Sequence, residues 1–536
     1  MSLFDFNLEN KGLLLEKVVR RVYDEYLSIS EDRREQLLLE MIYWEKKRQD
    51  RVKNRFQKWR KIRYWEKYEQ SYLQGSSLER QRCIHESIEH YANQIVGNFS
   101  PLVYQAATKI IPPFLNLLFN ALSFRRIVSL GSSLSSLGEN LIISGDISWV
   151  KRLAGRGTLI WVPTHVSNFD SIILGTVFHY TDLPPVMYGA GLNLFYNKFI
   201  GFFMKNLGAY KVDRLRAHQI YKDVLKEYAT TSIEMGFHNL FFPGGTRSRS
   251  GAVEKKLKLG LVGSGLRAYI RNLQTAKKNP NIYIIPVTIN AHLTLEAETL
   301  IDDFLGARGQ SRYIIENDEF SSPMRLFSYL KSHIHLNSKT FVHLAAPLDP
   351  FGNRVDEQGS SIDHHGRLID ISRYVLKDGH VEIDEERDRN YTSELGNVLI
   401  DSYHRKNRVL STNLVAFTLY EMIAGRHPDF DIYKLLRTHA YGEPIELRDV
   451  YRTMDRVIAE LRQLDDQGRI VYDLSMRSKD TQDILNEALK IFASYHRRKT
   501  VDRVGDKIYV GDLLLLYYYH NRLIGYNLED MMRGIK

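Results

Sequence analysis

The feature that most limits the fold of this chain is an alternation of strand-like and helix-like segments, which begins at Ile142. The apolar run Thr158–Val162 predicts a buried strand that stops at Pro163, and Ser171–Phe178 predicts the next helix, beginning near Asn168. The same alternation predicts further strands at Gly208–Arg214, Asn239–Phe242, Ile282–Val287 and Phe341–Leu344, and helices at Ala217–Met235 and Gly260–Thr275. This order is typical of an α/β domain.

Helical sequence flanks the alternating part on both sides. Residues 13–95 are polar and mainly helical in pattern, and the chain becomes helical again from Ser393. Apolar residues at helical spacing predict one C-terminal helix with an apolar face: Leu447, Val450, Tyr451, Met454, Val457, Ile458, Leu461 and Leu464. A chain of 536 residues is too long for one core. We predict a helical N-terminal region at 1–140, an α/β domain at 141–392 and a helical C-terminal domain at 393–536.

The charge balance favours an anionic partner. The formal net charge of +10 at pH 7 suits phosphorylated small molecules, anionic lipid or nucleic acid. No base-reading module is recognisable, so we expect no nucleic acid. The single cysteine, Cys83, cannot form an intramolecular disulfide, which favours a reducing, cytoplasmic-side location. The first residues, Met1–Asp5, have neither a basic nor an apolar signal region, so no secretory signal is predicted.

Two early stretches suit a membrane surface. Lys46–Arg63 has ten Lys/Arg residues and one acid, Asp50, and aromatic residues lie within and around it. Such a helix suits an anionic membrane surface, or else its aromatic residues pack on the next helix. Ile110–Phe124 is uncharged and apolar, but as a helix it would rise about 22 Å, short of the roughly 30 Å hydrocarbon core, and Pro112–Pro113 interrupts it. We predict peripheral attachment at the cytoplasmic face and no transmembrane span.

The apolar segments also have a core interpretation. Leu115, Leu118, Phe119 and Leu122 fall at helical spacing, as expected of residues packed inside the protein. Leu192–Met204, apolar and aromatic except for Lys198, is either a core helix or a second membrane-facing patch. The sequence leaves both alternatives open.

A histidine and an aspartate follow the first predicted strand. His165 and Asp170 are five positions apart in a segment that can open a helix. Neutral histidine takes a hydroxyl proton at neutral pH, and a carboxylate on one ring nitrogen fixes the tautomer so that the other nitrogen accepts the proton. The pair alone is a weak signal, because a histidine is more often packed or capped than catalytic.

A basic, glycine-rich loop supplies a reason for an anion to lie near this pair. Gly244 and Gly245 permit close backbone approach, and Arg247 and Arg249 would point the same way in an extended loop. Guanidinium groups bind phosphate through paired, charge-assisted hydrogen bonds. Arg214, at the end of another predicted strand, is either part of this anion site or a surface ion pair.

Taken together, these segments resemble the four ordered motifs of the glycerophospholipid acyltransferases: His165-x4-Asp170, Gly208–Arg214, Phe242–Arg249 and Ile285–Val287. The length, the helical N-terminal region and the tail Leu513–Asn521 are similar to the large bacterial membrane-type glycerol-3-phosphate acyltransferases. This resemblance implies a central mixed sheet flanked by helices, the fold of that superfamily.

The resemblance also implies roles for individual residues. His165 is the implied base for the sn-1 hydroxyl of glycerol 3-phosphate, and Asp170 orients it. The implied acyl donor is acyl-CoA or acyl carrier protein, the product is lysophosphatidate, the first intermediate of phospholipid synthesis, and neither cofactor nor metal is required. Pro286 is implied to shape the site. The residues implied to surround the substrate phosphate are Arg214, Gly245, Arg247, Ser248 and Arg249.

One position departs from the resembled pattern. The third motif usually carries a glutamate before its glycine, and here that position is Gly244. Its loss is consistent with a different acceptor, such as dihydroxyacetone phosphate or a lysophospholipid, with transfer of the carboxylate's role to another residue, or with a catalytically impaired lipid-binding or scaffold protein. Because His165, Asp170 and both loop arginines are retained, we expect an active enzyme.

Overall fold

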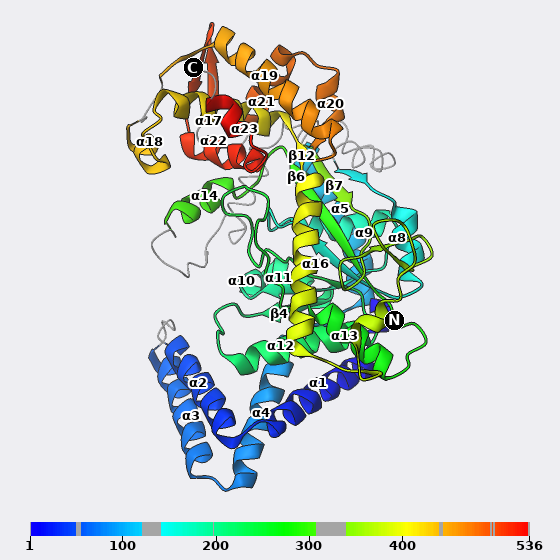
Figure 1. Cartoon of the computed structure of the whole chain (residues 1–536). Coiled ribbons are helices and arrows are strands. Elements are labelled where there is room, and N and C mark those ends of the chain that lie inside the picture. Colours follow the sequence, from blue (N-terminus) through cyan, green and yellow to red (C-terminus); the bar gives the residue numbers. More distant parts are fainter. Residues whose placement is uncertain are drawn as a thin grey trace.

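The computed structural model describes residues 2–49, 55–120, 141–196, 198–306, 339–438, 443–493, 496 and 499–533 (Figure 1). Its centre is a seven-stranded sheet in the order β1-β7-β6-β2-β5-β3-β4. The strands are β1 (Leu141–Ser144), β2 (Thr158–Pro163), β3 (Met187–Gly191), β4 (Ala209–Val212), β5 (Asn239–Leu240), β6 (Ile282–Ala291) and β7 (Thr340–Leu344). The predicted α/β class, with a central mixed sheet and helical regions at both ends of the chain, is confirmed.

Strand direction brings the motifs to one edge of the sheet. β2 pairs in parallel with β5 and β6, and β3 pairs in parallel with β4 and β5. Only β6 and β7 pair antiparallel within this sheet among the described strands. The carboxyl ends of β2, β4 and β5 therefore lie at the same edge, which is where open α/β sheets bind ligands.

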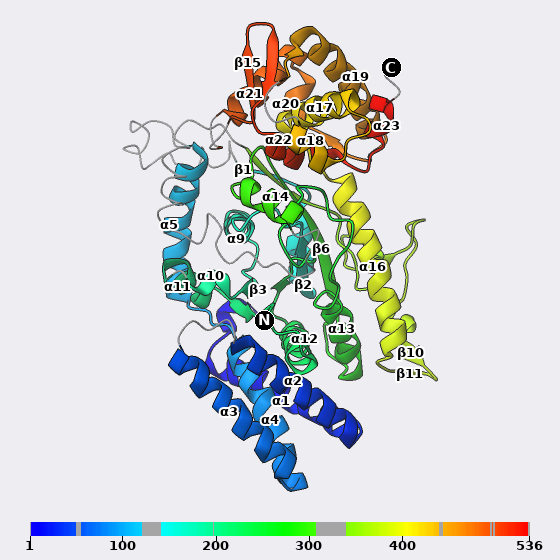
Figure 2. The same ribbon diagram turned by 90° about the vertical axis from the view of Figure 1, so that its left-hand side faces the viewer.

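Alternation along β2 divides the core between two faces. Leu159 and Trp161 pack in a cluster with side chains of α8 (Ile147–Ala154) and α9 (Asp170–Tyr180). Ile160 and Val162 belong to the cluster on the other face, with side chains of α12 (Gln219–Glu234) and α13 (Ser264–Gln274). Figure 2 shows α9 on one side of the sheet and α12 and α13 on the other. Both faces are covered, which explains why the strand reads as a continuous apolar run.

Most predicted elements of the sheet are present, with changes in length. β2, β7 and the helices α9, α12 and α13 lie where the sequence predicts them. β4 and β5 are shorter than predicted, because the chain turns away at the motif residues that follow them, and β6 extends to Ala291. β3 is an addition that the sequence analysis did not identify: Met187–Gly191 contains two glycines and lacks a strand-like apolar run.

The N-terminal helices form a group against α12 at one end of the molecule (Figures 1 and 2). They are α1 (Leu8–Ser28), α2 (Glu31–Arg48), α3 (Arg55–Gln74) and α4 (Ser77–Ile95), preceded by a short 3-10 helix at Leu3–Asp5. The basic stretch Lys46–Arg63 is thus divided between α2 and α3. Trp65 is buried, whereas Tyr43, Trp59 and Tyr64 are exposed. Part of the aromatic set therefore packs inside and part faces solvent.

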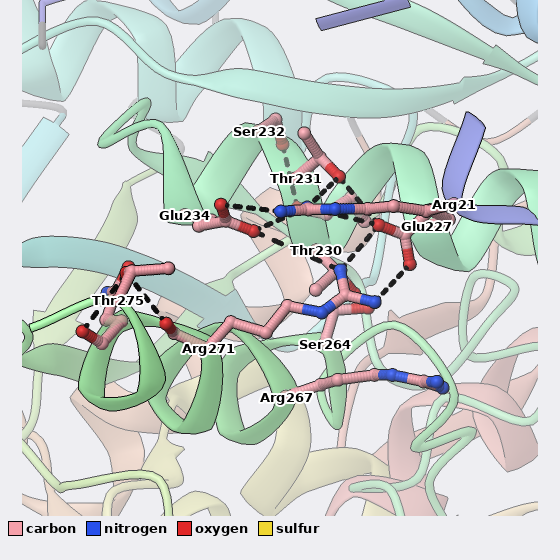
Figure 3. Close-up of polar contacts among 12 residues, drawn as sticks. Arg21, Glu227, Thr230, Thr231, Ser232, Glu234, Ser264, Arg267, Arg271 and Thr275 are labelled. Atoms are coloured by element: carbon pink, nitrogen blue, oxygen red, sulfur yellow. Dashed lines mark hydrogen bonds and ion pairs between the residues drawn. The ribbon is translucent and has the colours of Figure 1, made fainter. Parts of the chain in front are cut away.

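A charged cluster joins α1 to the α/β part (Figure 3). Arg21 donates to both carboxylate oxygens of Glu234, at 2.6 and 2.9 Å. Arg271 of α13 donates through Nη2 to Glu227 Oε2 at 2.9 Å, and Arg21 reaches Glu227 at 3.5 Å. Two arginines and two glutamates thus balance their charges in a largely buried setting.

The apolar segment after α4 forms α5 (Pro101–Asn120). The expectation that Pro112–Pro113 interrupts the helix is wrong: an internal proline removes one backbone hydrogen bond and bends a helix without necessarily ending it. The side chains of residues 111–120, and all of residues 121–140, lie outside the described part, which leaves Leu115, Leu118, Phe119 and Leu122 untested. Of the described helices, none combines the length and the apolar character needed to span a bilayer.

The second apolar segment forms two short helices, α10 (Asn193–Tyr196) and α11 (Lys198–Asn206). Met204 is buried and Phe202 is exposed. Beyond β6, the chain forms α14 (Ala297–Gly306), a 3-10 helix at Ile371–Val375 and short strand pairs. These strands are β8 (Arg354–Val355), β9 (Ser361–Ile362), β10 (Leu376–Lys377) and β11 (His380–Val381).

The C-terminal helices form a second group at the opposite end of the molecule (Figure 2). α16 (Glu385–Arg405) runs alongside the sheet toward them (Figure 1) and crosses the expected boundary at 392/393, which stays a prediction. The predicted apolar face of α19 is confirmed, since all its members except Tyr451 are buried. The elements are α17 (Ser411–Arg426), α18 (Ile432–Thr438), α19 (Leu447–Asp466), α20 (Leu474–Arg477), α21 (Thr481–Phe492), α22 (Leu513–His520), α23 (Leu528–Arg533), a 3-10 helix at Asn521–Leu523, β12 (Arg408–Val409), β13 (Ile445–Glu446), β14 (Val471–Tyr472), β15 (Val501–Val504) and β16 (Lys507–Val510).

Candidate active site

His165 and Asp170 lie at the carboxyl end of β2. The strand ends at Pro163, and Asp170 is the first residue of α9, so the six intervening residues, 164–169, form the turn between strand and helix. The carboxylate folds back over this turn. Its Oδ2 lies 2.9 Å from His165 Nδ1 and accepts hydrogen bonds from the backbone N–H groups of Val166 at 2.7 Å and Ser167 at 2.9 Å.

This arrangement selects one form of the imidazole. With the Asp170 carboxylate against Nδ1, that nitrogen carries the proton and Nε2 keeps its lone pair. Burial lowers the pKa of His165, Asp170 opposes this change, and the charges of Arg247 and Arg214 lower it further. The ring also stacks on Phe242, with centroids 4.0 Å apart. His165 is therefore neutral near pH 7 and oriented as a general base requires.

The loop that follows β5 is hydrogen-bonded directly to the histidine. Ser248 donates its backbone N–H to the carbonyl oxygen of His165 at 2.7 Å, while its hydroxyl donates to the Ala252 carbonyl, also at 2.7 Å. Gly245 has φ +73°, a conformation that favours glycine, and a Cβ there would meet the Lys258 side chain at 2.4 Å. The glycine thus permits both the turn and the close approach of Lys258.

Four cationic residues gather at this edge: Arg214, Arg247, Arg249 and Lys258. Partial desolvation and the charges of Arg247 and Arg249 lower the pKa of Arg214 to about 10. Partial desolvation and the charges of Arg214 and Arg249 also lower the pKa of Lys258. Mutual lowering of this kind occurs where cations repel one another, and a bound phosphate would relieve the repulsion.

A buried carboxylate links the two motifs. Glu296, which precedes α14 and is fully buried, accepts from the Ser167 hydroxyl at 2.8 Å and from the Asn168 N–H at 3.0 Å. The same carboxylate forms an ion pair with Arg247 Nη1 at 3.3 Å. It therefore fixes the position of the histidine turn relative to the arginine loop.

The structure brings most of the predicted site residues together. His165, Asp170 and Ser248 are joined by hydrogen bonds, and Arg214, Arg247 and Arg249 interact electrostatically, with Gly245 in the same loop. Pro286 lies in β6 opposite Val162 of β2, and its carbonyl oxygen accepts from Ala345 N–H at 2.9 Å. It therefore lies in the strand beside the site.

Four further residues belong to this site: Phe242, which lies in the third motif but was given no role there, and Glu254, Lys258 and Glu296, which lie outside all four motifs. Phe242 directly precedes the glycine-rich loop and Lys258 follows it by nine residues, so their proximity in the sequence was an available signal. Glu296 lies 126 residues beyond Asp170, at the far end of a strand and a turn, and it carries no local pattern. Among the described residues, no group of three or more His, Cys, Asp or Glu side chains is arranged to hold a metal ion.

Comparison with known proteins agrees with this geometry. Residues 147–290, which include His165, Asp170 and the arginine loop, match the family model described as Acyltransferase. Residues 147–290 therefore form an acyltransferase domain.

The curated relatives of this chain include three glycerol-3-phosphate acyltransferases from different genera. The protein of Pseudomonas paraeruginosa is 26% identical over 247 residues, which are 45% of this chain and 26% of the relative. That of Haemophilus ducreyi is 29% identical over 204 residues, which are 34% of this chain and 24% of the relative. That of Aeromonas hydrophila is 25% identical over 230 residues, which are 39% of this chain and 28% of the relative. The chain thus spans about a quarter of the length of the curated relatives it matches.

Proposed function

We propose that this acyltransferase moves a fatty acyl group from acyl-CoA or acyl carrier protein to the sn-1 hydroxyl of glycerol 3-phosphate, giving lysophosphatidate and a free thiol. The observation that carries the proposal is the presence of an oriented, neutral His165 and a cluster of four cations at one edge of the sheet. A small acceptor with both a hydroxyl and a phosphate matches this combination. The names of the relatives favour glycerol 3-phosphate among such acceptors.

In the proposed reaction, His165 Nε2 removes the proton of the sn-1 hydroxyl as that oxygen attacks the thioester carbon. Asp170 stabilises the imidazolium that forms, through the hydrogen bond to Nδ1. The tetrahedral intermediate then collapses, the C–S bond breaks, and the departing sulfur takes the proton back from the imidazolium. The thioester is already activated, so the reaction as proposed needs neither a covalent enzyme intermediate nor a cofactor.

The acceptor's phosphate is assigned to the cationic cluster. Arg247 is held by Glu296 and its charge acts on His165, while Arg214, Arg249 and Lys258 supply further charge. Gly245 and Ser248 contribute the tight backbone turn beside them. A phosphate bound there would leave the hydroxyl end of the acceptor available to His165.

The test uses purified protein, labelled glycerol 3-phosphate and an acyl thioester, with thiol release and labelled lysophosphatidate measured together. The His165→Ala variant is the matched control, because it removes the proposed base and leaves the cation cluster intact. We expect wild-type turnover to exceed that of His165→Ala by roughly 10²–10⁴-fold. Equal, slow release from both proteins would exclude His165 as the base.

Two other functions are kept as outcomes of the same assay. Direct competition among glycerol 3-phosphate, dihydroxyacetone phosphate and lysophospholipids identifies the preferred acceptor. An impaired lipid-binding or scaffold protein, the alternative raised by Gly244, would bind liposomes and turn over none of the acceptors.

We also propose that the protein attaches peripherally to an anionic membrane at the cytoplasmic face. The supporting observation is the pairing of exposed aromatic and cationic side chains on α2 and α3: Arg63 lies over Trp59 at 5.0 Å and Lys47 over Tyr43 at 5.6 Å. Exposed aromatic rings beside cations suit the headgroup region. Flotation with anionic liposomes at low and high salt tests this. Protein that stays with the aqueous fraction in both conditions would overturn the proposal.

A further inference from the structure

Glu254 contacts the backbone of His165 from outside all four sequence motifs. Its Oε1 accepts the His165 backbone N–H at 3.0 Å. The carbonyl oxygen of His165 accepts a hydrogen bond from the Ser248 N–H at 2.7 Å. The histidine is therefore held at both of its backbone polar groups, once by the arginine loop and once by Glu254.

The space that Glu254 occupies is the space beside Gly244. Gly244 does not have positive φ, so its backbone conformation does not require glycine. A Cβ at position 244 would lie 3.4 Å from Glu254 Cγ and 3.5 Å from its Oε1. A Cβ alone would make ordinary contacts at these distances, whereas a longer side chain that extends toward Glu254 would compete with it for the same volume. The absence of a side chain at Gly244 thus leaves room for the Glu254 carboxyl.

The chain after Glu254 is fixed against the loop by a second contact. Lys258 donates its backbone N–H to the Pro243 carbonyl at 2.6 Å, and its side chain crosses Gly245. The segment 254–258 therefore packs along the two adjacent glycines, with Glu254 against Gly244 and Lys258 against Gly245. Because the Lys258 contacts hold this segment against the loop, they also set the position of Glu254.

The other carboxyl oxygen of Glu254 has no such partner. Oε2 is shielded from solvent and forms no hydrogen bond within the described part of the chain. Burial raises the pKa of Glu254, although the His165 N–H and the charge of Arg522 oppose this change, and Asp170 adds to it. An unpaired buried oxygen is costly. A carboxyl is therefore a poor choice for a purely structural acceptor at this point.

We propose that Glu254 is a positioning residue of the acyl transfer, holding His165 from the volume that Gly244 leaves open and so supplying from position 254 the loop carboxylate that the resembled motif carries at position 244. The inference rests on the proposed function. Glu254 acts through His165: with the backbone fixed at both ends and Nδ1 held by Asp170, Nε2 is confined to one direction. A displacement of about 1 Å in such a group can cost roughly 10²-fold in rate.

The first experiment compares Glu254→Ala with Glu254→Gln in the labelled glycerol 3-phosphate assay. Alanine removes the acceptor for the His165 N–H, whereas glutamine keeps an oxygen in place. We expect kcat to fall roughly 10- to 100-fold in Glu254→Ala, with KM for glycerol 3-phosphate changed less than about threefold, and Glu254→Gln to recover most of kcat. The matched control is Glu357→Ala, an exposed acid that pairs with Arg152 of α8.

The second experiment moves the carboxylate. Gly244→Glu in the wild-type background should lower kcat, because two side chains then compete for one volume. In the Glu254→Ala background the same substitution should raise kcat at least about threefold, because the volume is vacant. A purely structural role for Glu254 predicts no such reversal of sign.

The outcomes separate the inference from the proposed function. If wild type transfers no acyl group to glycerol 3-phosphate, the proposed function fails. If wild type is active and folded Glu254→Ala matches it in kcat, the positioning role alone is overturned. Equal losses from Gly244→Glu in both backgrounds would also overturn it. Should Glu254→Ala not fold, Glu254→Asp, which withdraws the carboxyl by one methylene, decides the question: wild-type kcat in that variant contradicts the proposal.

Discussion

Two charged clusters in this protein have opposite electrostatic character. In the joint between α1, α12 and α13, Arg21 and Arg271 face Glu227 and Glu234 (Figure 3). Burial alone would lower the pKa of Arg21, but hydrogen bonding and charge from Glu234 and Glu227 raise it. At the sheet edge, desolvation and neighbouring cations lower the pKa values of Arg214 and Lys258. The charges of the first cluster balance one another, whereas the proposed function assigns a substrate phosphate to the second.

This difference separates stability from function. A balanced buried cluster gains nothing from a ligand, and removal of one member leaves an uncompensated charge. A cluster of mutually repelling cations costs stability in the free protein, and a bound phosphate lowers that cost. Substitutions in the two places should therefore affect different measurements.

The largest contrast is expected between Asp170→Asn and Glu227→Gln. Asparagine cannot stabilise the imidazolium and can hold the wrong tautomer, so kcat should fall by roughly 10³-fold or more with little change in the melting temperature. Glu227→Gln should lower the melting temperature and leave kcat near the wild-type value. Steady-state kinetics and thermal unfolding of both variants provide the measurement. A large loss of kcat in Glu227→Gln would contradict the division between the clusters.

The next contrast is between the two arginines. Arg271→Ala leaves Glu227 buried without its closest partner, which should cost about 3 kcal/mol of unfolding free energy. Arg247→Ala should raise KM for glycerol 3-phosphate by roughly 10- to 50-fold, because it removes charge-assisted bonds of about 1.5–2.3 kcal/mol.

The matched measurement for Arg247→Ala is KM for the acyl thioester, which should change far less. Since Arg247 also pairs with Glu296, denaturant unfolding must accompany the kinetics. If both KM values rise equally, Arg247 does not contact the acceptor's phosphate.

Inorganic phosphate provides a smaller effect that requires no catalysis. A ligand at ten times its Kd stabilises the folded protein by about 1.4 kcal/mol, so phosphate should raise the melting temperature by a few degrees. Arg249→Ala and Lys258→Ala should weaken this response, whereas Lys151→Ala, a cation on α8 that pairs with Asp182, should not. Equal shifts in all four proteins would indicate a general salt effect and no phosphate site.

The sequence predicted those parts of the site that depend on local pattern. The apolar run Thr158–Val162 predicted the buried strand β2. The spacing of His165 and Asp170 predicted the turn in which their side chains meet. Parallel strand direction then brought the arginine loop to the same edge. Glu296 and Glu254 could not be found this way, because their contacts with the histidine turn join residues 89 to 129 positions apart. β3 was missed since its two glycines give no apolar run.

The smallest expected effect concerns the pH dependence of the base. Burial and the charges of Arg247 and Arg214 place the pKa of His165 below its ordinary value. The neutral form is the active base, so kcat/KM should be retained above that pKa and lost as the pH falls through it, with the acid limb below about pH 6.5. Arg214→Ala removes one of the charges that lower the pKa of His165, so the acid limb of the pH profile should move toward higher pH. Arg271→Ala, in the balanced cluster, should leave the limb in place; a shift in that variant equal to that in Arg214→Ala would show that the two clusters are not electrostatically separate.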